Sequence, residues 1–202
     1  MEIGFNSVMY DGSRKKYVDN AAMTKRVVDF CHGRDVSVQG ELGSVPYVGE
    51  TSTQTIVWEE YMTDPEEACR FVEETGIDTL AVAIGNAHGF FPERSEPDYA
   101  RLEKLRKCVR VPIVLHGASN WEGERVSKVI SLGVSCFNID TAIRLSFLSQ
   151  LSQTLSGGDE TDLRKVLGTA RRSAEAAVWK KIDAFGSEGK AEGWEVEMQS
   201  SK

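Results

Sequence analysis

The chain has 202 residues, of which 41% are hydrophobic and 27% are charged, and its net charge is −7 at pH 7. This length and composition are typical of one globular domain with a buried core. The acidic balance argues against nucleic acid or an acidic membrane surface as a partner. No apolar stretch approaches the roughly 20 residues of a membrane span.

Four widely spaced cysteines occur in the sequence, and none belongs to a Cys-x-x-Cys pair. Separate cysteines of this kind are typical of reduced thiols in a cytoplasmic protein. The first residues lack the basic and then apolar pattern of a signal peptide, which agrees with that expectation. We therefore expect a cytoplasmic protein.

Short apolar runs alternate with amphipathic patterns along the chain. The runs at 7–10, 36–38, 79–84, 111–115 and 134–139 predict strands. Helices are predicted near 20–34, from 64–67 onward, and near 102–109, 122–132, 141–155 and 161–185. Asp64 before Pro65 is a typical helix start. The expected apolar stripes are Met23, Val27, Phe30 and Cys31 in the first helix and Leu163, Val166, Leu167, Ala170, Ala174, Ala177 and Val178 in the last. The stretch 44–61 is long for a connection, which predicts a lid or disorder.

Five consecutive strand–helix units predict a parallel sheet covered by helices. Polar residues follow the strands at one end, namely Asp11, Ser13, Glu41, His88, His116, Ser119, Asn138, Asp140 and Thr141. In a (β/α)8 barrel, active sites are built at that end. A doubly wound open sheet is the alternative, but no Gly-x-Gly-x-x-Gly turn follows any strand. We therefore favour a barrel-type α/β fold.

Two similar tripeptides, Ala87-His88-Gly89 and Leu115-His116-Gly117, lie 28 residues apart, each after an apolar run. Such a spacing fits one strand–helix–strand unit. Because neighbouring parallel strands lie roughly 4.8 Å apart, the two imidazoles are able to approach one metal ion. A core or turn histidine is the alternative interpretation of each. We predict that both are metal ligands.

Small and hydroxyl residues follow the last two strands, in Gly117-Ala118-Ser119 and Asn138-Ile-Asp-Thr141. Backbone N–H groups in such segments bind oxyanions, and phosphate sites in barrels lie on the last strands. Helix capping by Asp140 or Thr141 is an alternative role that is compatible with phosphate binding. Arg144 is a further candidate for positive charge.

The acids at two strand ends, Asp11 and Glu41, are candidates for supporting an imidazole or weakly binding a metal, with solvent or a turn as the alternative. His32 is rejected as a third ligand. It precedes Gly33 at the end of a helix and the start of a strand, which places it at the opposite end of the sheet.

Six motifs together resemble the class II, zinc-dependent ketose-bisphosphate aldolases, which include fructose- and tagatose-bisphosphate aldolases. The motifs are Gly4-Phe-Asn-Ser-Val-Met-Tyr-Asp-Gly-Ser13, Val38-Gln-Gly-Glu-Leu-Gly43, Tyr61-Met-Thr-Asp-Pro-Glu-Glu-Ala68, Ala83-Ile-Gly-Asn-Ala-His-Gly89, Val114-Leu-His-Gly-Ala-Ser119 and Asn138-Ile-Asp-Thr141. They span residues 2–150 in order. The resemblance implies reversible cleavage of a ketose 1,6-bisphosphate to dihydroxyacetone phosphate and an aldehyde, in carbohydrate metabolism and glycolysis.

The resemblance also implies roles for individual residues. His88 and His116 are zinc ligands, and Glu41 lies near the metal as a supporting group; a second divalent or monovalent cation is a further expectation. The residues expected to hold the dihydroxyacetone-phosphate half of the substrate are Gly89, Gly117, Ser119, Asn138, Asp140 and Thr141. The implied assembly is a homo-oligomer or part of a longer chain.

The sequence departs from the family pattern at several positions. The family's acid/base aspartate and the zinc histidine that follows it lie on an earlier strand and match no residue here. The resemblance therefore predicts an incomplete TIM barrel of about five units, strands four to eight, over residues 1–186, with C-terminal helices and a polar tail over 187–202. Gln39 stands where an acid is common, Asn120 and Trp121 replace a glycine, and Ala142 stands where an acid is frequent.

Three functions remain open at this point. The first is an aldolase that is incomplete as this chain alone. The second is a non-catalytic protein that binds a sugar phosphate, as a pseudoenzyme or a subunit of a larger assembly. The third is a metal-free barrel enzyme that handles phosphates, such as an isomerase.

Overall fold

The computed structural model describes residues 4–45, 57–87, 96–121, 123–158 and 160–191. The chain divides into two compact units, Met1–Ala142 and Ile143–Lys202, and we describe each by itself. Among the helices formed by the described residues, none is both long enough and apolar enough to cross a membrane.

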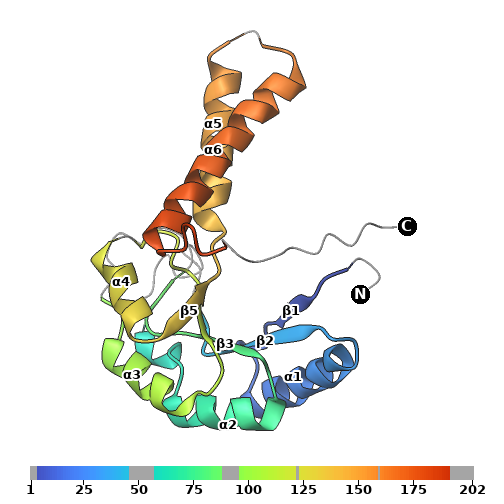
Figure 1. The fold of residues 1–202 in the computed structure, drawn as a ribbon, viewed down its shortest axis with the longest axis vertical. Coiled ribbons are helices and arrows are strands. Elements are labelled where there is room, and N and C mark those ends of the chain that lie inside the picture. Colours follow the sequence, from blue (N-terminus) through green and yellow to red (C-terminus); the bar gives the residue numbers. More distant parts are fainter. Residues whose placement is uncertain (1–3, 46–56, 88–95, 122, 159, 192–202) are drawn as a thin grey trace. The chain divides into compact units, whose positions relative to one another are not determined.

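The first unit is built on a parallel sheet (Figure 1). Its strands are β1 (Ser7–Tyr10), β2 (Ser37–Leu42), β3 (Thr79–Val82), β4 (Ile113–Leu115) and β5 (Val134–Phe137). They pair in sequence order, β1-β2-β3-β4-β5, and every neighbouring pair is parallel. A doubly wound sheet reverses its strand order, whereas a barrel does not. The order therefore confirms an α/β fold of the barrel type, and the sheet formed by the described residues is open.

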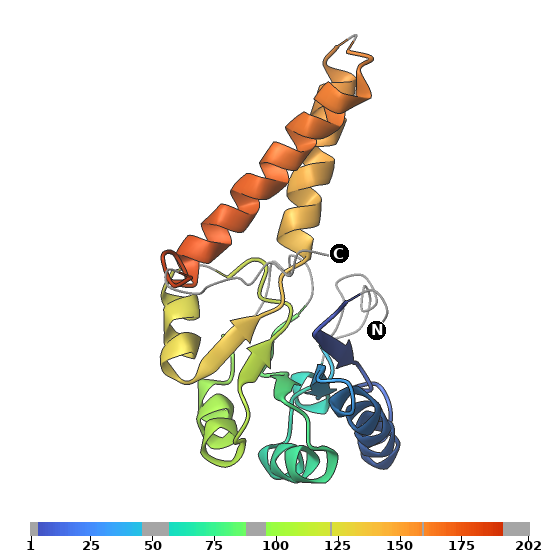
Figure 2. The ribbon, with the colours of Figure 1, turned by 45° about the vertical axis from the view of Figure 1, so that its right-hand side comes forward.

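Four helices lie on the same side of the sheet (Figures 1 and 2). They are α1 (Tyr17–His32), α2 (Pro65–Thr75), α3 (Tyr99–Cys108) and α4 (Glu124–Ser131). The start of α2 is the one predicted: the Asp64 side chain accepts hydrogen bonds from the N–H groups of Glu66 and Glu67, both at 2.9 Å, and Pro65 occupies the first turn. This cap satisfies two backbone donors that a helix end otherwise leaves free.

The core lies between the sheet and these helices. Leu80 on β3 and Ile113 on β4 are fully buried, as are Phe71 on α2 and Leu102 on α3. The register pairs Gly40 with Leu80 and Leu80 with Ile113, so these three positions face the same side. That side is the helix side, because a Cβ on Gly40 would lie 3.1 Å from Phe71. The opposite face of the sheet is therefore free of this helix layer.

The predicted apolar stripe of α1 is wrong in part. Cys31 is buried, but Met23 is 38% exposed and Phe30 is 54% exposed. The buried face of α1 also includes two polar residues. Thr24 donates to the Asn20 side chain, and Asn20 Nδ2 donates to the Glu41 carbonyl at 2.9 Å. A satisfied polar pair can occupy a core position without the cost of an unpaired group. Hydrophobic periodicity alone does not detect such a pair.

The second unit holds two helices that run in opposite directions, α5 (Thr141–Ser156), which begins in the first unit, and α6 (Leu163–Ala184) (Figures 1 and 2). The predicted stripe of α6 is buried only at Val166 and Ala170, whereas Leu163, Leu167 and Val178 are exposed. The prediction of one buried face is therefore wrong for α6, because a single neighbouring helix in its unit does not cover the whole stripe.

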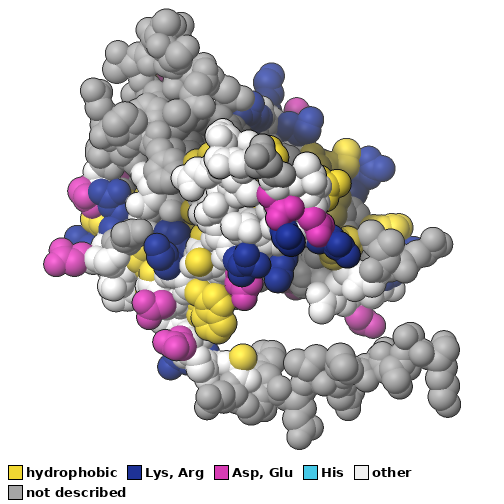
Figure 3. Space-filling view, turned by 90° about the horizontal axis from the view of Figure 1, so that it is seen from above, with side chains coloured by type: hydrophobic (Ala, Val, Ile, Leu, Met, Phe, Trp, Pro, Cys, Tyr) yellow, Lys and Arg dark blue, Asp and Glu magenta, His cyan; other side chains and the backbone are white. Residues whose placement is uncertain are grey.

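Basic and acidic side chains are interspersed on the face shown in Figure 3.

Two predicted connections lie mostly outside the described residues. Within the stretch 44–61, a short 3-10 helix spans Trp58–Glu60, and 46–56 are not described. Of the predicted tail 187–202, only 187–191 are described.

Candidate metal and phosphate site

The register of the sheet gathers four polar side chains on the face that the helices do not cover. Glu41 pairs with Ala81, and Ala81 pairs with Val114, so these three residues face the same side of the sheet. Because side chains alternate along a strand, Gln39, two residues before Glu41, and His116, two residues after Val114, face that side as well. Phe137 pairs with Leu115, which brings Asn138 level with His116. The carboxyl ends of β2, β4 and β5 therefore meet at one edge, as in the active-site end of a barrel.

The imidazole of His116 is the centre of this cluster. It is 9% exposed, and its Nδ1 lies 3.4 Å from Glu41 Oε2. On the other side, Nε2 lies 2.9 Å from Asn138 Nδ2 and 3.1 Å from Gln39 Oε1. Asn138 Nδ2 also donates to Gln39 Oε1 at 2.8 Å. The imidazole therefore lies between the Glu41 carboxyl group at Nδ1 and two amide side chains at Nε2.

The carboxyl group of Glu41 is 3% exposed. Burial and, after it, the negative charge of Asp11 together raise the pKa of Glu41 to about 8, although a hydrogen bond from Ser13 partly offsets them. Asp11 itself accepts hydrogen bonds from the N–H of Ser13 at 2.9 Å and from its hydroxyl at 2.7 Å. Asp11 is thus an acidic neighbour of Glu41.

The backbone of the cluster is held by buried amide side chains. Asn86 Nδ2 donates to the carbonyl of His116 at 2.9 Å, and Asn86 Oδ1 accepts from the N–H of Ile84 at 2.7 Å. Asn20 holds the carbonyl of Glu41 in the same way. Both asparagines are 1% exposed.

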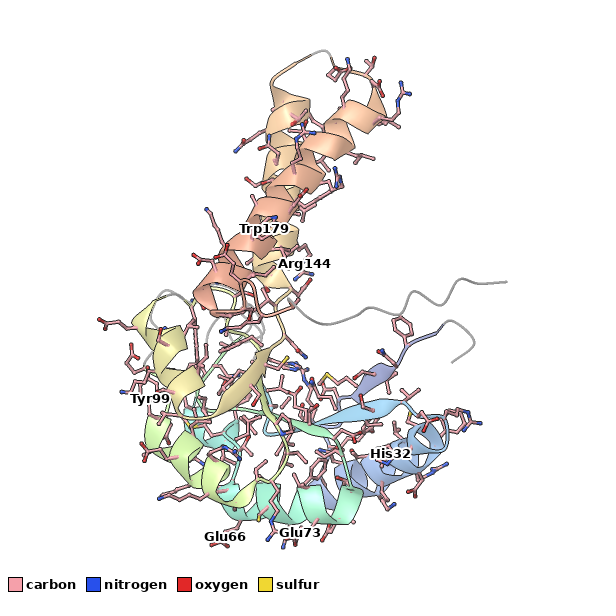
Figure 4. All side chains as sticks on the ribbon, in the orientation of Figure 1. His32, Glu66, Glu73, Tyr99, Arg144 and Trp179 are labelled. Atoms are coloured by element: carbon pink, nitrogen blue, oxygen red, sulfur yellow. The ribbon has the colours of Figure 1, made fainter. Side chains whose placement is uncertain are left out.

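The segment predicted to bind phosphate follows β4 directly. Gly117 has a φ of 66°, a left-handed conformation that favours glycine, and Ser119 is 6% exposed. Asp140 is exposed, and Thr141 is the first residue of α5. Arg144, the further candidate, belongs to the second unit (Figure 4).

Two predicted site residues, His88 and Gly89, lie outside the described residues. His32 lies at the end of α1 (Figure 4) and contacts Asp78 at 2.9 Å, and Asp78 also accepts from the N–H of Val38. These contacts are at the amino ends of β2 and β3, so His32 lies at the end of the sheet where the sequence placed it.

Sequence reasoning missed the supporting role of two amides. Gln39 had no predicted contact with His116, and Asn86 had no predicted role. Each carried a weak signal, because Gln39 is two residues before Glu41 and Asn86 is two residues before His88. Alternation along a strand places Gln39 on the face of Glu41.

The described donor set fits one edge of a zinc site. A buried imidazole whose second nitrogen faces a carboxylate is the usual arrangement of a zinc-binding histidine. Glu41 provides that carboxylate at 3.4 Å. Within the described ranges, no three His, Cys, Asp or Glu side chains converge as a complete metal site. His116 and Glu41 are thus compatible with zinc.

Comparisons with known proteins show the family to which the chain is similar. The sequence profile of class II fructose-bisphosphate aldolases matches residues 1–190. The YdjI aldolase from Escherichia coli K12 is 33% identical with a TM-score of 0.77, over 94% of this chain and 63% of that one. A proposed fructose-1,6-biphosphate aldolase from Coccidioides immitis is also 33% identical, with a TM-score of 0.81, over 94% of this chain and 66% of that one.

A more distant structure supports the fold alone. The fructose-bisphosphate aldolase from Campylobacter jejuni is 21% identical, with a TM-score of 0.70, over 89% of this chain and 60% of that one. The chain described here belongs to the class II fructose-bisphosphate aldolase family. It spans between 60% and 66% of the length of these solved structures.

Proposed function

We propose that this chain takes part in zinc-dependent, reversible aldol cleavage of a ketose 1,6-bisphosphate to dihydroxyacetone phosphate and an aldehyde. The observation that carries the proposal is the buried His116 imidazole, held between Glu41 on one side and Gln39 and Asn138 on the other. Membership in the aldolase family supports the reaction class. The second function considered above, a protein that binds a sugar phosphate without catalysis, would use the same site.

In this proposal, His88 and His116 bind zinc and Glu41 orients His116. Zinc, when bound, supplies a Lewis acid for the ketose carbonyl. The residues proposed to hold the dihydroxyacetone-phosphate half are Gly89, Gly117, Ser119, Asn138, Asp140 and Thr141. The buried Ser119 hydroxyl and the left-handed turn at Gly117 support a close approach of the substrate to this backbone. With zinc bound, Glu41 would be ionised and would accept a hydrogen bond from Nδ1 of His116, which leaves Nε2 to the metal.

We propose further features of the protein as a whole. Residues 1–186 form the aldolase domain, 187–202 form a polar tail, and the protein is cytoplasmic. It assembles as a homo-oligomer or acts within a longer chain. Exposed leucines on α5 and α6, with exposures of 43–69%, support an assembly that covers them.

The proposal is tested by zinc titration and by aldol cleavage of fructose and tagatose 1,6-bisphosphates, followed through triose phosphate release. We expect His116→Ala to weaken zinc binding at least 10-fold and to abolish any cleavage, because it removes a first ligand. His32→Ala is the matched control and leaves both unchanged. Zinc binding that is unaffected by His116→Ala contradicts the proposal. Binding of dihydroxyacetone phosphate without cleavage favours the pseudoenzyme alternative.

A further inference from the structure

Asn86 connects the ends of two neighbouring strands through both atoms of its amide. Its Oδ1 accepts the N–H of Ile84, just beyond β3, and its Nδ2 donates to the carbonyl of His116, just beyond β4. The residue is 1% exposed, so water does not compete for these bonds. The two distances, 2.7 and 2.9 Å, are those of well-formed hydrogen bonds.

The Asn86 amide provides a hydrogen bond beyond the point where backbone pairing between β3 and β4 ends. Regular pairing between β3 and β4 stops at Val82 and Leu115. Beyond it, the chain after β3 turns to other partners, because the N–H of Ala83 donates to Thr63 Oγ1 and the carbonyl of Ile84 accepts from Asp98. Asn86 supplies the hydrogen bond that joins this turned segment to the His116 carbonyl. The strand ends are thereby fixed relative to each other where the site lies.

We propose that Asn86 is a positioning residue for the metal site, acting through the backbone of His116. This inference rests on the proposed zinc role of His116. Both of these hydrogen bonds join the asparagine to backbone groups. It fixes the peptide group of His116 relative to the segment that follows β3. In the sequence, His88 comes two residues after Asn86.

The position requires one donor and one acceptor on a short side chain. An asparagine amide provides both at once, whereas a carboxylate only accepts and a hydroxyl is too short to span both partners. The turn also needs Gly85, whose φ of 88° favours glycine. Without the donor, the buried His116 carbonyl loses its partner and the peptide is free to shift. Metal affinity responds to such small displacements, because partners beyond the direct ligands change it by about 10- to 100-fold.

The test is the zinc dissociation constant of the 202-residue chain, measured by competition with a chromogenic chelator. Asn86→Asp keeps the acceptor for Ile84 and removes the donor to His116. We expect its zinc affinity to fall about 10-fold or more. Cobalt substitution gives a second readout, because the ligand-field bands of Co²⁺ shift when the imidazole moves.

Thr75→Val is the matched control. Thr75 is fully buried and donates from Oγ1 to the Phe71 carbonyl at 2.6 Å, at the end of α2. Its replacement also removes a buried side chain-to-backbone hydrogen bond, but away from the site. We expect it to lower the Tm without changing the zinc dissociation constant or the cobalt spectrum.

The outcomes separate this inference from the proposed function. If the wild-type chain binds zinc through His116 and Asn86→Asp changes only the Tm, the positioning role is wrong and the proposed function stands. If zinc binding does not depend on His116, the proposed function itself is wrong. Should Asn86→Asp not fold, Asn86→Ser carries the same test, because its hydroxyl is too short to span both partners and adds no charge. Unchanged zinc affinity in the folded serine variant overturns the inference.

Discussion

At the scale of single residues, the buried carboxyl group of Glu41 has the most perturbed acidity of the described site. Its pKa of about 8 lies above the ordinary value of 4.5, chiefly because burial disfavours the charged form. Between these two values the folded chain holds a proton that the unfolded chain has released. The stabilising effect of that proton is complete below about pH 4.5 and is lost as the pH rises toward 8.

We predict that the free energy of unfolding of the metal-free chain falls between about pH 4.5 and pH 8, and that Glu41→Gln removes part of this fall. The difference in free energy of unfolding between the wild-type chain and Glu41→Gln changes by at most about 1.4 kcal/mol per pH unit. Urea denaturation in the presence of a chelator, at several pH values, measures it.

The control for this prediction is Glu73→Gln, on the exposed side of α2 (Figure 4). It is expected to leave the pH dependence unchanged, because Glu73 is exposed to water. Parallel pH profiles of wild type and Glu41→Gln would contradict the account of a buried, protonated Glu41.

The residues of the site differ in how far the sequence predicts them. His116 and Glu41 were predictable because each follows an apolar run, and strand ends in parallel sheets meet at one edge. The sequence did not predict the contact between His116 and Glu41 or the roles of Gln39 and Asn86. These depend on the strand register and on the turn after β3. His88 remains a prediction, since it lies outside the described residues.

At the scale of elements, local signals predicted α2 well and α1 less well. The Asp64 cap and Pro65 act through the backbone of their own helix, so the sequence contains the whole argument. The buried face of α1 depends instead on Asn20, whose amide reaches the Glu41 carbonyl on a strand 21 residues away. Long-range hydrogen bonds of this kind leave no periodic pattern.

The prediction that copies of this chain associate rests on the exposed leucines of α5 and α6. Leu148 is 49% exposed and Leu167 is 46% exposed, and α5 has a single charged residue, Arg144. Burying a leucine side chain in an interface yields about 1.5–3 kcal/mol. We therefore predict that the wild-type chain sediments as a dimer or larger at micromolar concentrations and that Leu148→Glu with Leu167→Glu sediments as a monomer.

Lys180→Glu, an exposed change of charge on α6, is the control for association and should leave the oligomer intact. A wild-type chain that sediments as a monomer throughout the concentration range would show that these leucines form no interface between copies.

At the scale of the whole molecule, strand–helix alternation was enough to predict the fold class. Each apolar run became a parallel strand, and sequential order distinguishes the barrel type from a doubly wound sheet. Strand ends were less predictable: the run at 111–115 forms a strand only from Ile113 to Leu115, because Pro112 has no N–H for the ladder.

The central claim is that imidazoles from two neighbouring strand ends bind one zinc ion. X-ray absorption at the zinc edge of the zinc-loaded chain tests it most directly. We predict two imidazole nitrogens at about 2.0–2.1 Å from zinc, with one lost in His88→Ala and one lost in His116→Ala. A zinc environment without imidazole, or one that neither variant changes, would contradict the claim.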